Sequence, residues 1–234
     1  MARRRWIADE ISGSRAALVG DHADHLSRVL RASVGQEFDI STGDAIRRGR
    51  IARIDPGRVE FELGEEVAGA AITAITLVLS VFKFDRMEWA IEKCTELGVA
   101  RMIPVIARRT ESHLAAAAVK RVERWRRIAK QAAEQSRRAA PPEILAPVPL
   151  KGAVALRGAP RIVLAETEQK ILLKDALNFA KEPVLAFGPE GGWTEAEITL
   201  FRDAGWLSAS LGSTILRAET AAIAATAIVV AAMQ

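Results

Sequence analysis

Residues 187–192 have the sequence Phe187-Gly188-Pro189-Glu190-Gly191-Gly192, and they lie between a predicted strand and a predicted helix. The apolar residues 184–187 predict the strand, and Thr194 with Glu197 predicts the capping box that begins the helix. Glycine has no Cβ, so it permits positive φ and lets a planar or anionic ligand lie against the backbone. The spacing differs from that of a dinucleotide fingerprint or a P-loop. The stretch therefore predicts a ligand-binding loop of another kind, with a tight turn that binds nothing as the alternative.

A second glycine-containing segment follows a strand in the same way. It extends from Leu211 to Ala221, before the C-terminal helix, and a third predicted strand ends at Leu164-Ala165-Glu166. Ligands of open α/β sheets bind beyond the carboxyl ends of the strands, so we expect these three segments to form one pocket. No Gly-x-Ser-x-Gly motif is present, and the histidines lie elsewhere, at His22, His25 and His113. The sequence therefore argues against a hydrolase with a Ser-His-Asp triad.

From residue 74 onward, apolar segments alternate with amphipathic segments, which is typical of a parallel sheet with helices on its faces. We predict strands near residues 75–81, 101–106, 161–165, 184–187 and 207–211. The helix after the first strand has apolar residues at helical spacing, with Gly98 placed to cap its end. Cys94 belongs to this apolar face. We therefore expect Cys94 to be buried and structural, not a nucleophile.

Residues 1–67 contain short segments in which polar and apolar residues alternate, separated by turn residues such as those at 42–44 and 55–57. Segments 37–40 and 58–63 are typical of half-buried antiparallel strands. One predicted helix, around residues 21–31, interrupts the strands. A small β-barrel is the simplest architecture for this pattern, and the Ala- and Gly-rich residues 65–73 are the predicted linker.

The composition predicts a globular protein of the reducing cytoplasm. Of the 234 residues, 50% are hydrophobic and 26% are charged, which excludes a disordered or low-complexity chain. One cysteine cannot form an internal disulfide, and one cysteine with 3 histidines does not make a usual zinc site, so we expect no metal. Acidic residues follow the basic N-terminus, which argues against an export signal, and the apolar stretch 221–233 is too short to cross a membrane.

The excess of basic residues is confined to the middle of the chain. Residues 70–150 carry 14 basic and 8 acidic side chains, whereas the segments before and after are nearly neutral. The basic residues lie along a predicted helix and just past its end, at Lys120-Arg121, Arg124, Arg126-Arg127, Lys130 and Arg137-Arg138. A polyanion is the natural partner of such a surface, and a solvated helix face is the alternative.

Together these segments resemble the cofactor signature of the SPOUT superfamily of knotted S-adenosylmethionine-dependent RNA methyltransferases. The resemblance rests on residues 188–192, Leu211-Gly212 and residues 215–221. More narrowly, the chain is similar to the 16S rRNA (uracil(1498)-N(3))-methyltransferases along almost its whole length. Further matches are His25, residues 28–31, Met87-Glu88, Lys93, residues 96–99, Pro104, Trp125, Glu134-Gln135-Ser136 and Arg138. Ser213, where a proline is frequent, and Arg137, in place of a common glycine, are small departures.

The resemblance implies an α/β protein with a PUA-like RNA-binding β-barrel at residues 1–68 and a SPOUT methyltransferase domain at residues 74–234. The C-terminal part of that domain is expected to form a deep trefoil knot. A homodimer is implied, which would cover the apolar helix predicted from Glu219 to Met233. The implied cofactor is S-adenosyl-L-methionine, held by Leu164, Glu166, Gly188, Glu190, Gly191, Gly192, Leu211, Gly212, Ile215, Leu216 and Arg217.

The implied activity is methylation of N3 of uridine 1498 in 16S rRNA of the small ribosomal subunit. Uracil N3 is protonated at neutral pH, and cationic donors stabilise its anion. We therefore expect Arg138 and Arg217 to be catalytic, with water or a carboxylate such as Glu219 as the proton acceptor. The alternative role of Arg217 is only to pair with Glu219 or to support the cofactor loop.

The arginines expected to contact rRNA are Arg28, Arg31, Arg86, Arg124, Arg127, Arg137 and Arg138. Two other functions agree with the same residues. One is methylation of a ribose 2′-oxygen by another member of the superfamily, and the other is RNA binding without catalysis.

Overall fold

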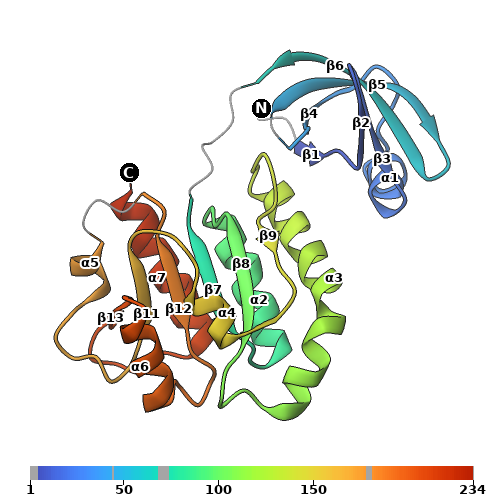
Figure 1. The fold of residues 1–234 in the computed structure, drawn as a ribbon. Helices are drawn as coiled ribbons and strands as arrows, with labels where there is room; N and C mark the ends of the chain where they lie inside the picture. The colour runs from blue at the N-terminus through green and yellow to red at the C-terminus, as the bar shows by residue number, and fades with distance from the viewer. Residues whose placement is uncertain (1–4, 44, 68–73, 178–180, 234) are drawn as a thin grey trace. The chain divides into compact units, whose positions relative to one another are not determined.

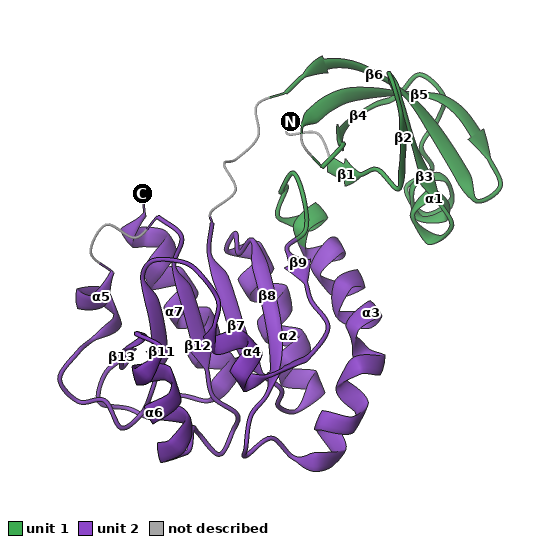
Figure 2. Cartoon of the chain, in the orientation of Figure 1, with its two compact units in different colours: residues 1–71, 133–141 green, residues 72–132, 142–234 purple. Residues whose placement is uncertain are grey.

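The computed structural model describes residues 5–43, 45–67, 74–177 and 181–233. The chain divides into two compact units (Figure 2). Unit 1 contains Met1–Ala71 and Ala133–Pro141, and unit 2 contains Ile72–Ala132 and Pro142–Gln234. Residues 133–141 thus group with the N-terminal unit, although they fall within residues 74–234, the range expected for the methyltransferase domain.

Unit 1 is built around one curled sheet of six strands in the order β1-β4-β5-β6-β3-β2 (Figure 1). The pair β1–β4 is parallel and the other neighbours are antiparallel. In β6, Val59, Phe61 and Leu63 are buried and alternate with more exposed charged residues, which confirms the predicted half-buried strands. The strands are β1 (Arg5–Ile7), β2 (Glu10–Ser12), β3 (Arg15–Val19), β4 (Glu37–Ser41), β5 (Ile46–Asp55) and β6 (Arg58–Glu66).

Two boundaries in unit 1 differ from the prediction. The helical segment consists of α1 (Asp21–Asp24) and a π-helical turn, His25–Val29, so the helix predicted to residue 31 ends sooner. Arg31 has a φ of 53°, a left-handed conformation that cannot continue a right-handed helix. Strand β6 reaches Glu66, so the predicted linker begins too early, and its residues 68–73 lie outside the described residues.

The C-terminal end of the basic helix α3 (Ser112–Gln135) belongs to unit 1. The backbone N–H of Ile7 donates a hydrogen bond to Glu134 Oε1 over 3.2 Å. The hydroxyl of Ser41 donates to the carbonyl oxygen of Ala139. These contacts attach residues 133–141 to β1 and β4, and sequence periodicity carries no information about such long-range contacts.

Unit 2 contains a parallel sheet in the order β10-β8-β7-β12-β11-β13, with β9 beside β8. All five predicted strands are confirmed: β8 and β12 have the predicted bounds, and the other three are one or two residues shorter. The two-residue strands β9 and β10 were not predicted. The strands are β7 (Thr76–Ser80), β8 (Arg101–Ile106), β9 (Glu143–Ile144), β10 (Val148–Pro149), β11 (Arg161–Leu164), β12 (Val184–Phe187) and β13 (Leu207–Ala209).

Helices cover both faces of this sheet (Figure 1). Leu77 and Leu79 of β7 pack on one side in a core with α2, α3 and α7, whereas Val78 packs on the other side with α4 and α6. Strands buried on both faces are apolar throughout, as β12 is. The remaining helices are α2 (Phe84–Glu96), α4 (Leu150–Val154), α5 (Leu173–Ala176), α6 (Glu195–Asp203) and α7 (Ala218–Ala232).

Cys94 lies in the core between α2 and α7, as predicted. Its thiol is fully buried and is 3.6 Å from Thr226 Oγ1. Burial raises the pKa of Cys94 to about 12, so the side chain remains a neutral thiol at physiological pH. Gly98, with a φ of 101°, follows the end of α2 in the predicted capping position.

The segment between β13 and α7 begins beside the connection that follows β11. Ser210 exchanges backbone hydrogen bonds with the segment after β11: its N–H donates to Ile171 and its carbonyl accepts from Leu173, both over 2.9 Å. The chain then returns to α7, which packs against α2 and β12. These hydrogen bonds place the start of the C-terminal segment against residues 171–173, an earlier connection of the chain. Within the described residues, no helix combines the length and apolar character needed to span a bilayer.

Candidate active site

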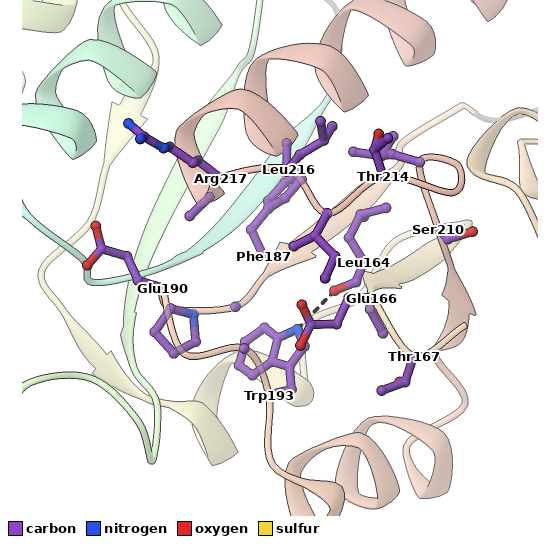
Figure 3. Close-up of a pocket in the computed structure, with 18 of the residues that line it drawn as sticks. Leu164, Glu166, Thr167, Phe187, Glu190, Trp193, Ser210, Thr214, Leu216 and Arg217 are labelled. Atoms are coloured by element: carbon purple, nitrogen blue, oxygen red, sulfur yellow. Dashed lines mark hydrogen bonds between the residues drawn. The ribbon is translucent and has the colours of Figure 1, made fainter. Parts of the chain in front are cut away.

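Three adjacent strands end at one cavity in unit 2. β11 ends at Leu164, β12 at Phe187 and β13 at Ala209, and the strands are parallel, so their carboxyl ends share one edge of the sheet. The loops that follow line a cavity of about 650 Å³ (Figure 3). This volume is typical of a small-molecule site, and its place is where ligands of open α/β sheets bind.

The cavity brings together ten of the eleven residues expected to hold the cofactor. They come from the three loops predicted to converge: Leu164, Glu166, Gly188, Glu190, Gly192, Leu211, Gly212, Ile215, Leu216 and Arg217. Gly191 is not part of the lining, because it lies against the side chain of Arg109 on another side of the loop.

Two glycines of the lining have backbone conformations that other residues rarely adopt. Gly192 has a φ of 69° and Gly212 a φ of 127°. A Cβ at Gly192 would lie 3.0 Å from Glu166 Oε1, whereas a Cβ at Gly212 would meet no described atom within 4 Å. Gly192 therefore lets the loop approach Glu166, and Gly212 borders open space in the cavity.

The start of α6 fixes the far end of the glycine loop. The predicted capping box is present: Glu197 N–H donates to Thr194 Oγ1 over 3.3 Å, and Thr194 N–H donates to Glu197 Oε2 over 2.8 Å. The side chains of Thr194 and Glu197 thus each accept a hydrogen bond from a backbone N–H at the helix terminus. The loop therefore enters the helix in a defined direction.

Trp193 lines the cavity, and sequence reasoning missed it. Its indole Nε1–H donates to the carbonyl oxygen of Leu164 over 3.1 Å, which links the glycine loop to the end of β11 (Figure 3). Trp193 precedes the N-cap Thr194 and belongs to the same apolar cluster as Ile198. An apolar residue before the N-cap paired with one four residues after the cap is the hydrophobic-staple pattern, and that signal was available in the sequence.

Arg86 is also a cavity residue, although its expected partner is rRNA. Its Nη1 lies 2.6 Å from Glu190 Oε1, and its Nε lies 3.8 Å from Glu219 Oε1. Glu219 is only 3% exposed, and its Oε2 has no hydrogen-bond partner among the described residues. Arg86 thus neutralises a buried carboxylate and a cavity carboxylate together.

The two arginines expected to be catalytic lie in different units. Arg217 is the N-cap residue of α7, is exposed and lines the cavity. Its expected alternative partner, Glu219, pairs with Arg86 instead, and no ion pair of Arg217 is found among the described residues. Arg138 belongs to unit 1 and is 9% exposed. Burial lowers the pKa of Arg138 to about 10, which still leaves the guanidinium charged at neutral pH.

The other arginines expected to contact rRNA differ in their partners. Arg124 forms two hydrogen bonds with Glu88, of 2.7 and 2.8 Å, and Arg28 lies 3.4 Å from Asp24. Arg127 is exposed on α3, and no ion pair is found for it among the residues that the structure describes. Arg31 and Arg137 have positive φ and belong to unit 1. Among the described residues, no group of three or more His, Cys, Asp or Glu could hold a metal ion.

Comparison with known proteins identifies the family. The family model of the RNA methyltransferase domain matches residues 70–230. The chain is 32% identical over 230 residues to ribosomal RNA small subunit methyltransferase E of Synechocystis, covering 94% of this chain and 75% of the relative. It is 31% identical over 220 residues to the Aquifex aeolicus protein of the same name, covering 93% and 95%.

Solved structures agree with this assignment. Ribosomal RNA small subunit methyltransferase E of Neisseria gonorrhoeae, bound to S-adenosyl methionine, is 30% identical with a TM-score of 0.86, over 99% of this chain and 97% of that one. A putative methyltransferase of Legionella pneumophila, with the same cofactor, is 28% identical with a TM-score of 0.89, over 99% and 98%. The chain therefore belongs to the ribosomal RNA small subunit methyltransferase E family of RNA methyltransferases.

Proposed function

We propose that this protein transfers a methyl group from S-adenosylmethionine to 16S rRNA in the small ribosomal subunit, at N3 of uridine 1498. The observation that carries the proposal is the cavity at three parallel strand ends, lined by ten of the residues that the family signature implies. The sequence relatives named for small-subunit rRNA methylation support the substrate class. The choice of N3 and of position 1498 rests on the resemblance to the uracil-N3 methyltransferases.

The lining of the cavity fits the proposed cofactor. Leu164, Leu211 and Leu216 supply apolar side chains for a flat base, while Glu166 and Glu190 supply carboxylates for hydroxyl groups and positive charge. Ile215 is 80% exposed, which is unusual for a large apolar side chain at a cavity and agrees with a ligand that covers it. When bound, the cofactor supplies a methyl group on a positively charged sulfur.

The chain's own contribution to the proposed reaction is to stabilise negative charge on uracil. Arg217 lines the cavity with an exposed guanidinium, and Arg138 is a buried guanidinium that stays charged. Either side chain can donate hydrogen bonds to an oxygen that becomes negative when N3 loses its proton. Glu219 is buried and does not line the cavity, which favours water as the proton acceptor.

The proposal extends to the assembly and its location. α7 buries Ala222, Ala225 and Val229, while Thr220 and Ala227 are exposed on an otherwise apolar helix. A second copy of the chain would cover this remaining face, so we include a homodimer in the proposal. A cytoplasmic location follows from a ribosomal substrate.

The proposal is tested by methylation of unmodified small subunits with methyl-labelled cofactor, followed by digestion and mass spectrometry of the nucleosides. We expect label in 3-methyluridine at position 1498. Label in a 2′-O-methylated nucleoside would favour the ribose methyltransferase, and rRNA binding without label would favour a non-catalytic protein.

A further inference from the structure

The turn between β8 and α3 contacts the glycine loop from outside the cavity. Arg109 Nη1 in this turn donates to the carbonyl oxygen of Gly191 over 2.7 Å and to that of Trp193 over 3.3 Å. Both carbonyls belong to the connection between β12 and α6. One guanidinium therefore holds two peptide groups of the loop, on either side of Gly192.

The same turn also holds the start of α6. The backbone N–H of Arg108 donates to Glu197 Oε1 over 2.7 Å. Glu197 is 8% exposed, and its other oxygen accepts hydrogen bonds from the N–H and the hydroxyl of Thr194, both over 2.8 Å. Since this second link uses a backbone N–H, it does not depend on the side chain of Arg108 or of Arg109.

The stem of Arg109 also packs against the loop. A Cβ at Gly191 would lie 3.4 Å from Arg109 Cδ and 3.5 Å from Arg109 Cβ, so this face of Gly191 lies against the arginine. Glu190, Gly192 and Trp193 line the cavity, whereas Arg109 does not. Arg109 thus contacts the loop between residues that would touch a ligand, without touching the ligand itself.

We propose that Arg109 is a positioning residue, which holds the glycine loop in the conformation that binds the cofactor. The inference rests on the proposed function, because the ligand of the loop is taken to be S-adenosylmethionine. Trp193 connects Arg109 to the end of β11. Its carbonyl oxygen accepts a hydrogen bond from Arg109, and its indole N–H donates one to the carbonyl oxygen of Leu164. Without the guanidinium, the loop must be ordered when the cofactor binds, and the cost of that ordering reduces affinity.

The test is calorimetric titration of the full-length protein with S-adenosylmethionine in the absence of RNA. Arg109→Ala is expected to weaken cofactor binding by about tenfold or more. Arg108→Ala is the matched control, because it removes the same charge from the adjacent exposed position and leaves the backbone link to Glu197; we expect unchanged affinity. Arg109→Lys keeps one donor group without the planar fork, and we expect an affinity between those of the wild type and Arg109→Ala.

Steady-state methylation gives a second readout. A positioning role predicts a raised KM for the cofactor, with kcat largely kept at saturating cofactor and an unchanged KM for the small subunit. General loss of folded protein would lower kcat and leave both KM values unchanged. If circular dichroism shows that Arg109→Ala does not fold, Arg109→Lys takes its place in the test. Weaker cofactor binding by folded Arg109→Lys then supports the positioning role, and wild-type affinity contradicts it.

Two failures can be distinguished. A wild-type protein that does not bind S-adenosylmethionine would overturn the proposed function. A wild-type protein that binds it, together with folded Arg109 variants of equal affinity, would overturn only the role of Arg109. Equal weakening in Arg108→Ala and Arg109→Ala would likewise contradict the role, because it would indicate an effect of net charge.

Discussion

Arg86 Nη1 on α2 lies 2.6 Å from Glu190 Oε1 in the glycine loop, an ion pair between residues 104 positions apart in the sequence. The same guanidinium is 3.8 Å from Glu219 at the start of α7. Three segments that are distant in the chain therefore meet at one cation beside the cavity. The stability of this corner of the domain and the shape of the cavity depend on the same side chain.

Removing Arg86 is expected to destabilise the protein. In Arg86→Ala, the buried carboxylate of Glu219 loses its cation, and we expect the free energy of unfolding to fall by about 2 kcal/mol. Urea denaturation followed by circular dichroism measures the change. Lys83→Ala is the control: Lys83 is more exposed and is 4.0 Å from Glu190, so its loss is expected to cost less than about 0.5 kcal/mol. Equal effects of both substitutions would contradict the role assigned to Arg86.

Gly212→Ala is expected to impair cofactor binding specifically. Gly212 lines the cavity, and the new methyl group would occupy open space beside it. In addition, the φ of 127° is unfavourable for alanine. Gly57→Ala is the matched control, because Gly57 also has a positive φ, 70°, and open space around its Cβ, but lies in a turn of unit 1. Both variants should lose stability, and only Gly212→Ala should lose affinity in calorimetry. Unchanged affinity of Gly212→Ala would remove this loop from the cofactor site.

Two arginines of α3 should differ in their contribution to rRNA binding. Both side chains are exposed, but Arg124 donates two hydrogen bonds to the carboxylate of Glu88. If Arg127 contacts a phosphate, Arg127→Ala should reduce the slope of log affinity against log salt by about 0.7 for a single-stranded target. Arg124→Ala should reduce it less, because Glu88 already neutralises that charge. Binding to small subunits at several salt concentrations measures both slopes, and a slope unaffected by Arg127→Ala would exclude Arg127 from the phosphate contacts.

The catalytic arginine is identified by single-turnover methylation at saturating rRNA and cofactor. If Arg138 stabilises the uracil anion, Arg138→Lys should slow methyl transfer on the order of a hundredfold with little change in rRNA affinity, because lysine keeps the charge and loses the planar fork. Arg217→Ala tests the other candidate, the arginine that lines the cavity, in the same assay. Wild-type rates for both Arg138→Lys and Arg138→Ala would restrict Arg138 to phosphate binding and leave Arg217 as the candidate.

Local patterns predicted the elements around the cavity because the relevant signals are short-range. The apolar run at residues 184–187 and the capping box of Thr194 both lie within a few residues of the glycine loop, and both are confirmed. The convergence of three loops followed from one rule, that parallel strands share a carboxyl edge. The ten cavity residues themselves were named from the resemblance to the SPOUT methyltransferases, because the strand rule predicts where the loops meet but not which side chains bind a cofactor.

Long-range contacts could not be predicted in this way. The bond between Ile7 and Glu134 joins residues 127 positions apart, and it places the end of α3 in unit 1. Arg86 has the sequence context of an exposed helix residue, so its link to Glu190 and Glu219 became visible only in the fold. Strands β9 and β10 have two residues each, which is too short for a periodic pattern.

The most direct test of the account is mass spectrometry of 16S rRNA from cells with and without this protein. We predict that 3-methyluridine at position 1498 is absent when the protein is absent, and that it returns with the wild-type chain but not with Gly212→Ala. The same methylation at position 1498 in both kinds of cell, or the loss of a methyl group from a different atom or nucleotide instead, would contradict the proposed function.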